Sequence, residues 1–188
     1  IYDAPVFFKE CDVKPGDTGE VTISWHVYTN DAWGRIKLND TVEYENGCTQ
    51  PEEDEAKDSS CGSPGLNEGE LDENLLFTFW LDQGSLEGWQ CPKDTPKCTA
   101  DPQEGDNILN GIEVDSQTNS ILFQDLPVQT LSQDWFYIPN EIVASNTYYF
   151  GLQWHVANDI ENIIQTDSFA GKIVMQVVQS RNNPWNDQ

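Results

Sequence analysis

Oxygen-bearing side chains crowd into residues 104–113, which read EGDNILNGIE. Carboxylate and amide oxygens lie close together there, glycines permit a sharp turn, and a final Glu can bind a cation through both of its oxygens. Calcium takes about six to eight such oxygen ligands. A further carboxylate follows the apolar run before this segment. We therefore expect calcium as a cofactor, held by Asp82, Glu104, Asp106, Asn107, Asn110 and Glu113.

A second acidic stretch, residues 46–70, contains almost no large apolar side chain and is predicted to be a surface excursion. Its carboxylates have two interpretations. They form a solvated loop, or some of them collect calcium, the candidates being Glu52, Glu53, Asp54 and Glu70.

Catalytic chemistry finds little support. The chain has two histidines and no HExxH motif, which argues against a zinc centre. It also lacks a Gly-x-Ser-x-Gly nucleophile motif. We expect that the protein is not an enzyme.

The five cysteines lack a CxxC pair and are typical of disulfides in an oxidising compartment. Two pairs are close in sequence, Cys48 with Cys61 and Cys91 with Cys98. Each would close a short loop, worth about 2–3 kcal/mol through the entropy of the unfolded chain. Cys11 is left over, either as a buried free thiol or bonded to another chain.

The formal net charge of −24 argues against nucleic acid or an anionic membrane as a partner. The sequence has no run of about 20 apolar residues, so no membrane span is expected. It also shows no apolar signal segment, so we expect a mature, processed and exported form. Asn39, in the sequence Asn-Asp-Thr, is a candidate glycosylation site at a predicted turn between strands.

Most of the chain alternates between apolar and polar residues with the period of a β-strand. The clearest case is 147–156, where Tyr148, Phe150, Leu152, Trp154 and Val156 share one face. Strand 171–179 is apolar on both faces, which is typical of a central strand or of one that lies beneath a partner chain. Further strands are predicted at 21–27, 35–38, 42–44, 75–81 and 120–126, and single helical turns at 70–74 and 131–136.

These elements predict an all-β protein, a jelly-roll-like β-sandwich with long acidic loops, formed by residues 1–188 as a single domain. Residues 180–188 would be a polar tail. Residues 1–10 would be an edge strand or an arm, because Pro5 removes a backbone donor. That segment pairs within its own subunit or is lent to a neighbour.

Several short motifs, taken in order, resemble the archaeal TasA/camelysin-like proteins, which are exported with a SipW-type signal peptide. They are residues 12–17 (DVKPGD), 19–24 (GEVTIS), 30–33 (NDAW), 45–52 (ENGCTQPE), 69–74 (GELDEN), 79–82 (FWLD) and 165–168 (QTDS). The resemblance implies a jelly-roll subunit of an extracellular filament, pilus or biofilm matrix. Related archaeal bundling pili and cannulae are similar in plan, and cannulae add calcium at subunit contacts. Residues 83–103 resemble an insertion relative to the family.

The resemblance also implies donor-strand complementation, in which the first strand of one subunit completes the sheet of the next. We therefore expect a secreted structural protein whose partners are identical subunits in a head-to-tail polymer. The expected contact residues are Ile1, Tyr2, Val6, Phe7, Phe8, Val174 and Val178. The alternative is a monomeric, calcium-dependent extracellular binding or adhesion module.

Overall fold

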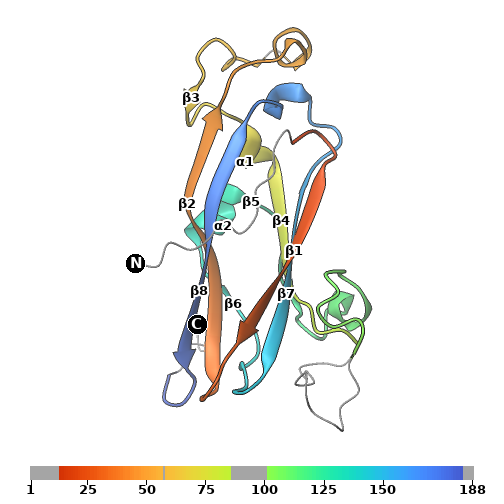
Figure 1. Ribbon diagram of the computed structural model, residues 1–188, viewed down its shortest axis with the longest axis vertical. Helices are drawn as coiled ribbons and strands as arrows, with labels where there is room; N and C mark the ends of the chain where they lie inside the picture. The colour runs from red at the N-terminus through yellow and green to blue at the C-terminus, as the bar shows by residue number, and fades with distance from the viewer. Residues whose placement is uncertain (1–12, 57, 86–100, 184–188) are drawn as a thin grey trace.

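The computed structural model describes residues 13–56, 58–85 and 101–183 (Figure 1). The strands are β1 (Thr18–His26), β2 (Ala32–Glu45), β3 (Gly65–Leu66), β4 (Leu75–Leu81), β5 (Ile121–Pro127), β6 (Phe136–Tyr137), β7 (Thr147–Val156) and β8 (Ser168–Gln179). The helical segments are short: α1 (Leu71–Asn74), α2 (Val128–Gln133), a π-helical turn (Glu52–Ala56) and two 3₁₀ turns (Gly111–Val114 and Asn162–Ile164).

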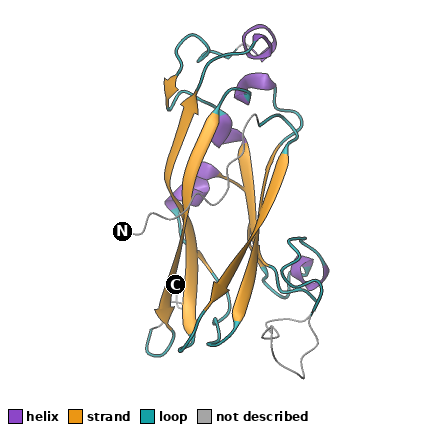
Figure 2. Ribbon diagram, viewed as in Figure 1, coloured by secondary structure: helices purple, strands orange, loops and turns teal. Residues whose placement is uncertain are grey.

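Two antiparallel sheets pack face to face (Figure 2), which confirms the predicted β-sandwich. One sheet has the order β1-β7-β4-β5. In the other, β2 is central, with β8 along one edge. β3 and β6 lie on the other edge of β2, because Tyr44 pairs with both Leu66 and Ser168, and Arg35 pairs with both Tyr137 and Gln176. Strands from the two ends of the chain therefore pair in both sheets, β1 with β7 and β2 with β8.

The core lies between the sheets and is filled by the alternate residues of each strand. All five residues predicted for the apolar face of β7 are buried, as the alternation in this strand required. Phe79 of β4 stacks between Phe150 and Phe123, at ring distances of 5.4 and 5.7 Å. β4 is also buried on its second face, as its nearly continuous apolar sequence predicted.

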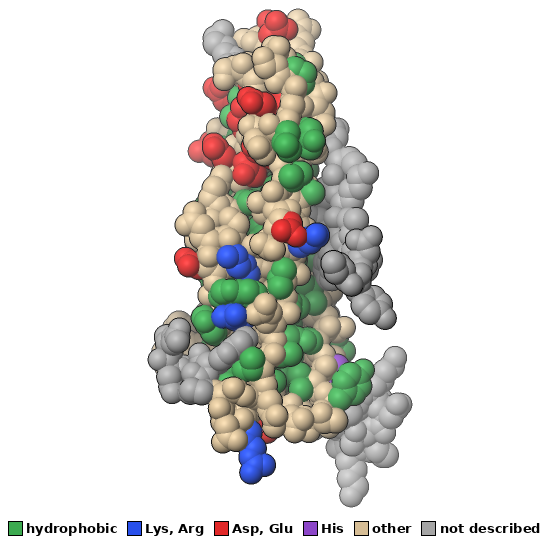
Figure 3. Space-filling model, turned by 90° about the vertical axis from the view of Figure 1, so that its left-hand side faces the viewer, with side chains coloured by type: hydrophobic (Ala, Val, Ile, Leu, Met, Phe, Trp, Pro, Cys, Tyr) green, Lys and Arg blue, Asp and Glu red, His purple; other side chains and the backbone are tan. Residues whose placement is uncertain are grey.

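Of the two positions predicted for β8, central in a sheet or beneath a partner chain, the structure excludes the central one. It is an edge strand, and within the described ranges its ladder partner is β2. Ile173 and Met175 pack against the core, while Val174 and Val178 lie on the outward face, each half-buried. The second apolar face of β8 therefore points to the outside of the sandwich, and no further layer of the described structure covers it. Figure 3 shows this side of the molecule, where hydrophobic side chains and Lys or Arg mix at the centre and acidic side chains gather toward one end.

β2 is one long strand, although the sequence predicted two short ones separated by a turn. The interruption at residues 39–41 is a β-bulge, with Asp40 at φ 49°, where the register against β8 shifts between Asn39 and Val42. An Asn-Asp-Thr sequence is compatible with either a turn or a bulge, and the long ladder with β8 favours the bulge. Asn39 is exposed there, with its amide donating to Asp40.

The predicted helical turn at 70–74 is confirmed as α1, and the other begins earlier than expected, as α2 directly after Pro127. The loop around Gly105 lies beside the outward face of the β1-β7-β4-β5 sheet. Gly105, at φ 69°, lies against the ring of Tyr149, where a Cβ would stand 2.9 Å away. Nearby, Trp80 is almost fully buried and lies across Gly151 of the neighbouring strand.

Candidate functional site

Two clusters of buried or partly buried carboxylates lie at opposite ends of the sandwich. One involves the end of β2, the loop of residues 46–70 and the start of β8; the other follows the end of β4 and includes residues 101–115 (Figure 1). We call them the β2-end cluster (Glu43, Glu45, Glu52, Glu70 and Asp167) and the β4-end cluster (Asp82, Glu104, Asp106 and Glu113).

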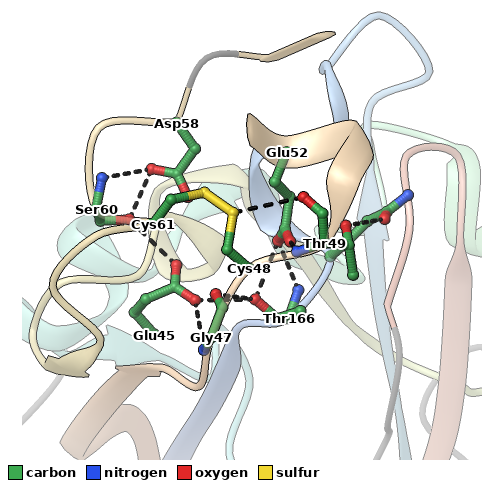
Figure 4. The surroundings of a disulfide bond; sticks show 10 residues. Glu45, Gly47, Cys48, Thr49, Glu52, Asp58, Ser60, Cys61 and Thr166 are labelled. Carbon is green, nitrogen blue, oxygen red and sulfur yellow. Dashed lines mark hydrogen bonds between the residues drawn. A yellow bond between two sulfur atoms is a disulfide. The ribbon is translucent and has the colours of Figure 1, made fainter. Parts of the chain in front are cut away.

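A disulfide joins Cys48 to Cys61 across the β2-end cluster, which confirms the predicted pairing (Figure 4). The bond closes the loop so that the Ser60 hydroxyl reaches the carboxylate of Glu45, at 3.1 Å. A structural disulfide indicates an oxidising, extracytoplasmic location. Cys11 and the predicted pair Cys91 and Cys98 lie outside the described residues.

Glu45, the last residue of β2, is only 2% exposed. Its Oε1 accepts the Gly47 backbone N–H at 2.9 Å and the Thr166 hydroxyl at 2.8 Å. Glu52 is fully buried; its Oε1 accepts the Thr166 N–H at 2.8 Å, and its Oε2 accepts the Thr49 N–H. These contacts, shown in Figure 4, fasten the loop of residues 46–70 to the segment that leads into β8.

Asp167 lies just before β8 and is 7% exposed. Its Oδ2 accepts the backbone N–H groups of Glu70 at 2.6 Å and Leu71 at 3.0 Å, which anchors the start of α1. One carboxylate oxygen from each of Glu45, Glu70 and Asp167 lies within 4.8 Å of the other two, so the three residues could hold a metal ion. Of the carboxylates that the sequence suggested in this region, Glu70 belongs to this triad and Glu52 lies beside it, whereas Glu53 and Asp54 are exposed.

Burial and mutual repulsion favour the neutral forms of this cluster. Loss of hydration raises the pKa of Asp167 to about 7, with Glu45 and Glu70 adding repulsion. The pKa of Glu70 is likewise raised to about 7, first by burial and then by Asp58 and Glu45. The pKa of Glu43 rises to about 8 through burial and its hydrogen-bonded neighbour Asp72. At neutral pH the cluster therefore retains protons or attracts a cation.

In the β4-end cluster, the predicted ligands come together, but main-chain groups already use many of their oxygens. Asp82 is fully buried and accepts the N–H groups of Gly105 at 3.0 Å and Asn107 at 2.8 Å. Glu113 is 1% exposed and accepts the N–H groups of Gly84 at 3.1 Å and Asn110 at 3.2 Å. The two carboxylates thus fix the path of the loop.

The other predicted ligands complete this arrangement. Asp106 accepts hydrogen bonds from the Ile108 N–H and from the Asn110 side-chain amide. Glu104 Oε1 and Asn107 Oδ1 are buried and have no hydrogen-bond partner among the described residues. Burial raises the pKa of Glu104 to about 7, with repulsion from Asp101 and Asp82, and it raises the pKa of Glu113 to about 7 as well. Burial is also the largest cause of the raised pKa of Asp82.

Glu45 and Asp167 were not identified from the sequence, although they are central to the triad. Glu45 ends an alternating strand and resembles a solvated carboxylate, and Asp167 stands in a polar connection. The β2–β8 register, in which Tyr44 pairs with Ser168, is what places them side by side. The available signal was weak: Glu45 directly follows the short predicted strand 42–44, and Asp167 stands four residues before the predicted strand 171–179.

Of the predicted contact residues, Val174 and Val178 share the outward face of β8, and Ile1 to Phe8 lie outside the described residues. No described helix is long and apolar enough to span a membrane. Comparison of the chain with models of known protein families, with curated proteins and with solved structures gave no match.

Proposed function

We propose that this protein is a secreted structural subunit of an extracellular filament, such as a pilus or a biofilm-matrix fibre, that assembles by donor-strand complementation. The resemblance to TasA/camelysin-like proteins motivates the proposal, and β8 supplies the structural observation that supports it. In finer detail we assign the sandwich to the jelly-roll class. The pairing of early with late strands, β1 with β7 and β2 with β8, supports that assignment.

The outer edge of β8 is suited to accept another strand. It extends over twelve residues, and β2 is the partner that the described part of the chain provides. Proteins usually protect such an edge with proline, charged side chains or a very short strand. The sequence of β8 has no proline and a single charged residue, Lys172, which is bound to Asp40 at 2.9 Å.

Residues 1–10 are the proposed donor. They are apolar and extended in pattern, with Ile1, Tyr2, Val6, Phe7 and Phe8 as anchors. Main-chain hydrogen bonds to the β8 edge would provide affinity, and the apolar side chains would fix the register. Val174 and Val178 would line the outward side of this contact. Because donor and acceptor are different surfaces, the contact repeats head to tail and produces a fibre.

Calcium is the proposed cofactor of the β4-end cluster. The buried oxygens of Glu104 and Asn107 support this assignment, since neither has a hydrogen-bond partner in the described structure. Asp82, Asp106, Asn110 and Glu113 are the remaining candidate ligands. The same observation favours a second function, a calcium-dependent adhesion module that remains monomeric.

Negative-stain microscopy and sedimentation of the purified protein, with calcium and with chelator, test the proposal. We expect long fibres from the full chain and a folded monomer after deletion of residues 1–10. Adding the synthetic peptide of residues 1–10 to the truncated protein should restore strand pairing and give a stoichiometric complex. Fibres that form equally well without residues 1–10 would exclude this donor. A full chain that stays monomeric in both conditions would exclude the filament.

A further inference from the structure

Asp167 carries a buried oxygen that the surrounding protein does not satisfy. Only 7% of the residue is exposed, and while Oδ2 accepts two backbone N–H groups, Oδ1 has no hydrogen-bond partner in the described parts of the chain. Glu70 Oε2 and Glu43 Oε2 are also buried without a described partner. A buried charged oxygen without a partner is strongly unfavourable. Of these three residues, Asp167 and Glu70 belong to the triad with Glu45.

We propose that Glu45, Glu70 and Asp167 form a divalent-cation site and that Ca²⁺ is the ion that fits it best. One oxygen from each lies within 4.8 Å of the other two. Two ligands at the usual Ca–O distance of about 2.4 Å can be up to about 4.8 Å apart. All three ligands are carboxylates, which suit a hard cation and not a thiophilic metal.

A polar cavity adjoins the site through Glu70, one of the three proposed ligands. Its volume is about 390 Å³, and Glu43, Ser60, Gly69, Glu70 and Glu73 contribute to its lining. An ion in this cavity would reach Glu70 first, and water molecules could complete its coordination. Three protein carboxylates and several waters in a flexible arrangement meet the demands of Ca²⁺ more readily than the strict octahedron of Mg²⁺.

The ion would connect segments that the sandwich otherwise holds separately. Glu45 ends β2, Asp167 precedes β8, and Glu70 precedes α1, which leads directly into β4 of the opposite sheet. A cation bound to all three therefore cross-links the two sheets at this end of the molecule. This site is distinct from the β4-end cluster and does not depend on filament assembly.

Protons compete with the ion for these carboxylates. Raising the pH removes the protons and leaves the carboxylates free to bind the ion. Titration should be done at pH 8 on the chelator-stripped full chain, with CaCl₂ or MgCl₂ as the probe in isothermal calorimetry and thermal unfolding. We expect a saturable Ca²⁺ site with a Kd of about 0.1–1 mM or tighter, as in extracellular calcium modules, and weaker Mg²⁺ binding. The melting temperature should increase with Ca²⁺.

Two variants assign the ion to its ligands. Asp167→Asn keeps an oxygen for the N–H groups of Glu70 and Leu71, and Glu70→Gln changes an oxygen that lacks a described partner. Each should weaken Ca²⁺ binding by about ten-fold or more, because affinity follows the number of charged ligands. Without Ca²⁺, each should melt at the wild-type temperature or above it, since a repulsive charge is gone. Glu113→Gln, in the other cluster, is the control and should retain this site.

The proposal is overturned if wild-type protein shows no saturable Ca²⁺ heat up to about 10 mM, well above the extracellular range. It is also overturned if Glu70→Gln and Asp167→Asn bind as wild type does while Glu113→Gln abolishes binding. That result would place the ion in the β4-end cluster. If Asp167→Asn does not fold, Glu70→Gln decides by itself.

Discussion

The carboxylate of Asp167 lies directly against Gly69: a Cβ built on Gly69 would stand 2.9 Å from its carboxyl carbon. That distance is shorter than carbon atoms tolerate without displacement. Gly69 therefore allows Asp167 to reach the N–H groups of Glu70 and Leu71, and any larger residue would push the carboxylate away from α1.

Gly69→Ala should consequently destabilise the protein by about 1–3 kcal/mol, the usual cost of overpacking a buried site. Chemical denaturation monitored by tryptophan fluorescence measures this. Gly62→Ala is the matched control, because it lies in the same loop with no atom within 4 Å of the added Cβ. Equal stabilities for the two variants would contradict the close contact between Gly69 and Asp167.

The raised carboxyl pKa values predict how stability depends on pH when the protein is free of divalent ions. Glu43 titrates at about 8 and Glu70 and Asp167 at about 7, against ordinary values of 4.5 for Glu and 3.8 for Asp. At pH values between the ordinary pKa of each carboxyl and its raised pKa, the native state binds more protons than the unfolded chain. The free energy of unfolding should therefore fall as pH rises from about 4 to about 8 in chelator, and then level off.

Urea unfolding at a series of pH values tests this trend. Ca²⁺ should reduce the loss at pH 8, because a bound cation stabilises the ionised carboxylates in place of protons. Glu70→Gln should show a smaller slope than wild type. Stability that increases over this range in chelator would show that the cluster ionises normally.

The Cys48–Cys61 disulfide should contribute about 2–3 kcal/mol, since it closes a loop with a sequence separation of 13. Replacing both cysteines with serine removes it and leaves the remaining cysteines unchanged. We also expect weaker Ca²⁺ binding, because the closed loop is what brings Ser60 onto Glu45. A double variant with the wild-type unfolding midpoint and unchanged Ca²⁺ affinity would mean that the hydrogen bonds alone hold the loop.

Val174→Asp and Val178→Asp should block assembly and leave the monomer folded. Both side chains are half-buried on the outward face of β8, so the loss of stability should be about 1 kcal/mol or less. Fibre yield by sedimentation and the unfolding midpoint together provide the measurement. Ser24→Asp adds the same charge to an exposed position of β1 and serves as the control. If the variants unfold, the two valines belong to the core and not to a contact surface.

Local sequence pattern was sufficient for much of the fold. The alternation in β7 identified both its limits and its buried face, and the apolar run of β4 indicated burial on both sides. The spacing of Cys48 and Cys61 identified their disulfide. These features depend on residues near one another in the chain. The period of the apolar residues, the length of a strand and the length of a disulfide loop can all be read from the sequence.

Features that depend on distant segments could not be obtained in this way. The apolar outward face of β8 fitted either a central strand or one beneath a partner chain, because a sequence does not say how many neighbours a strand has. The bulge at Asp40 resembled a turn until the ladder with β8 was known. Glu45 and Asp167 became neighbours only through that ladder. The β4-end residues lie in one region, but within the described residues the three carboxylates close enough to share an ion are Glu45, Glu70 and Asp167. The use of Asp82 by the loop's own N–H groups was also not anticipated.

The β2–β8 ladder also has a kinetic consequence. Glu45 and Thr166, which meet at its end, are 121 residues apart, so the β2-end cluster cannot exist until both halves of the chain have folded onto each other. Proteins rich in contacts of such long range fold slowly. Groups that meet only after the transition state affect the rate of unfolding far more than the rate of folding. If the β2-end cluster forms after the transition state, its loss should speed unfolding and leave the folding rate nearly unchanged.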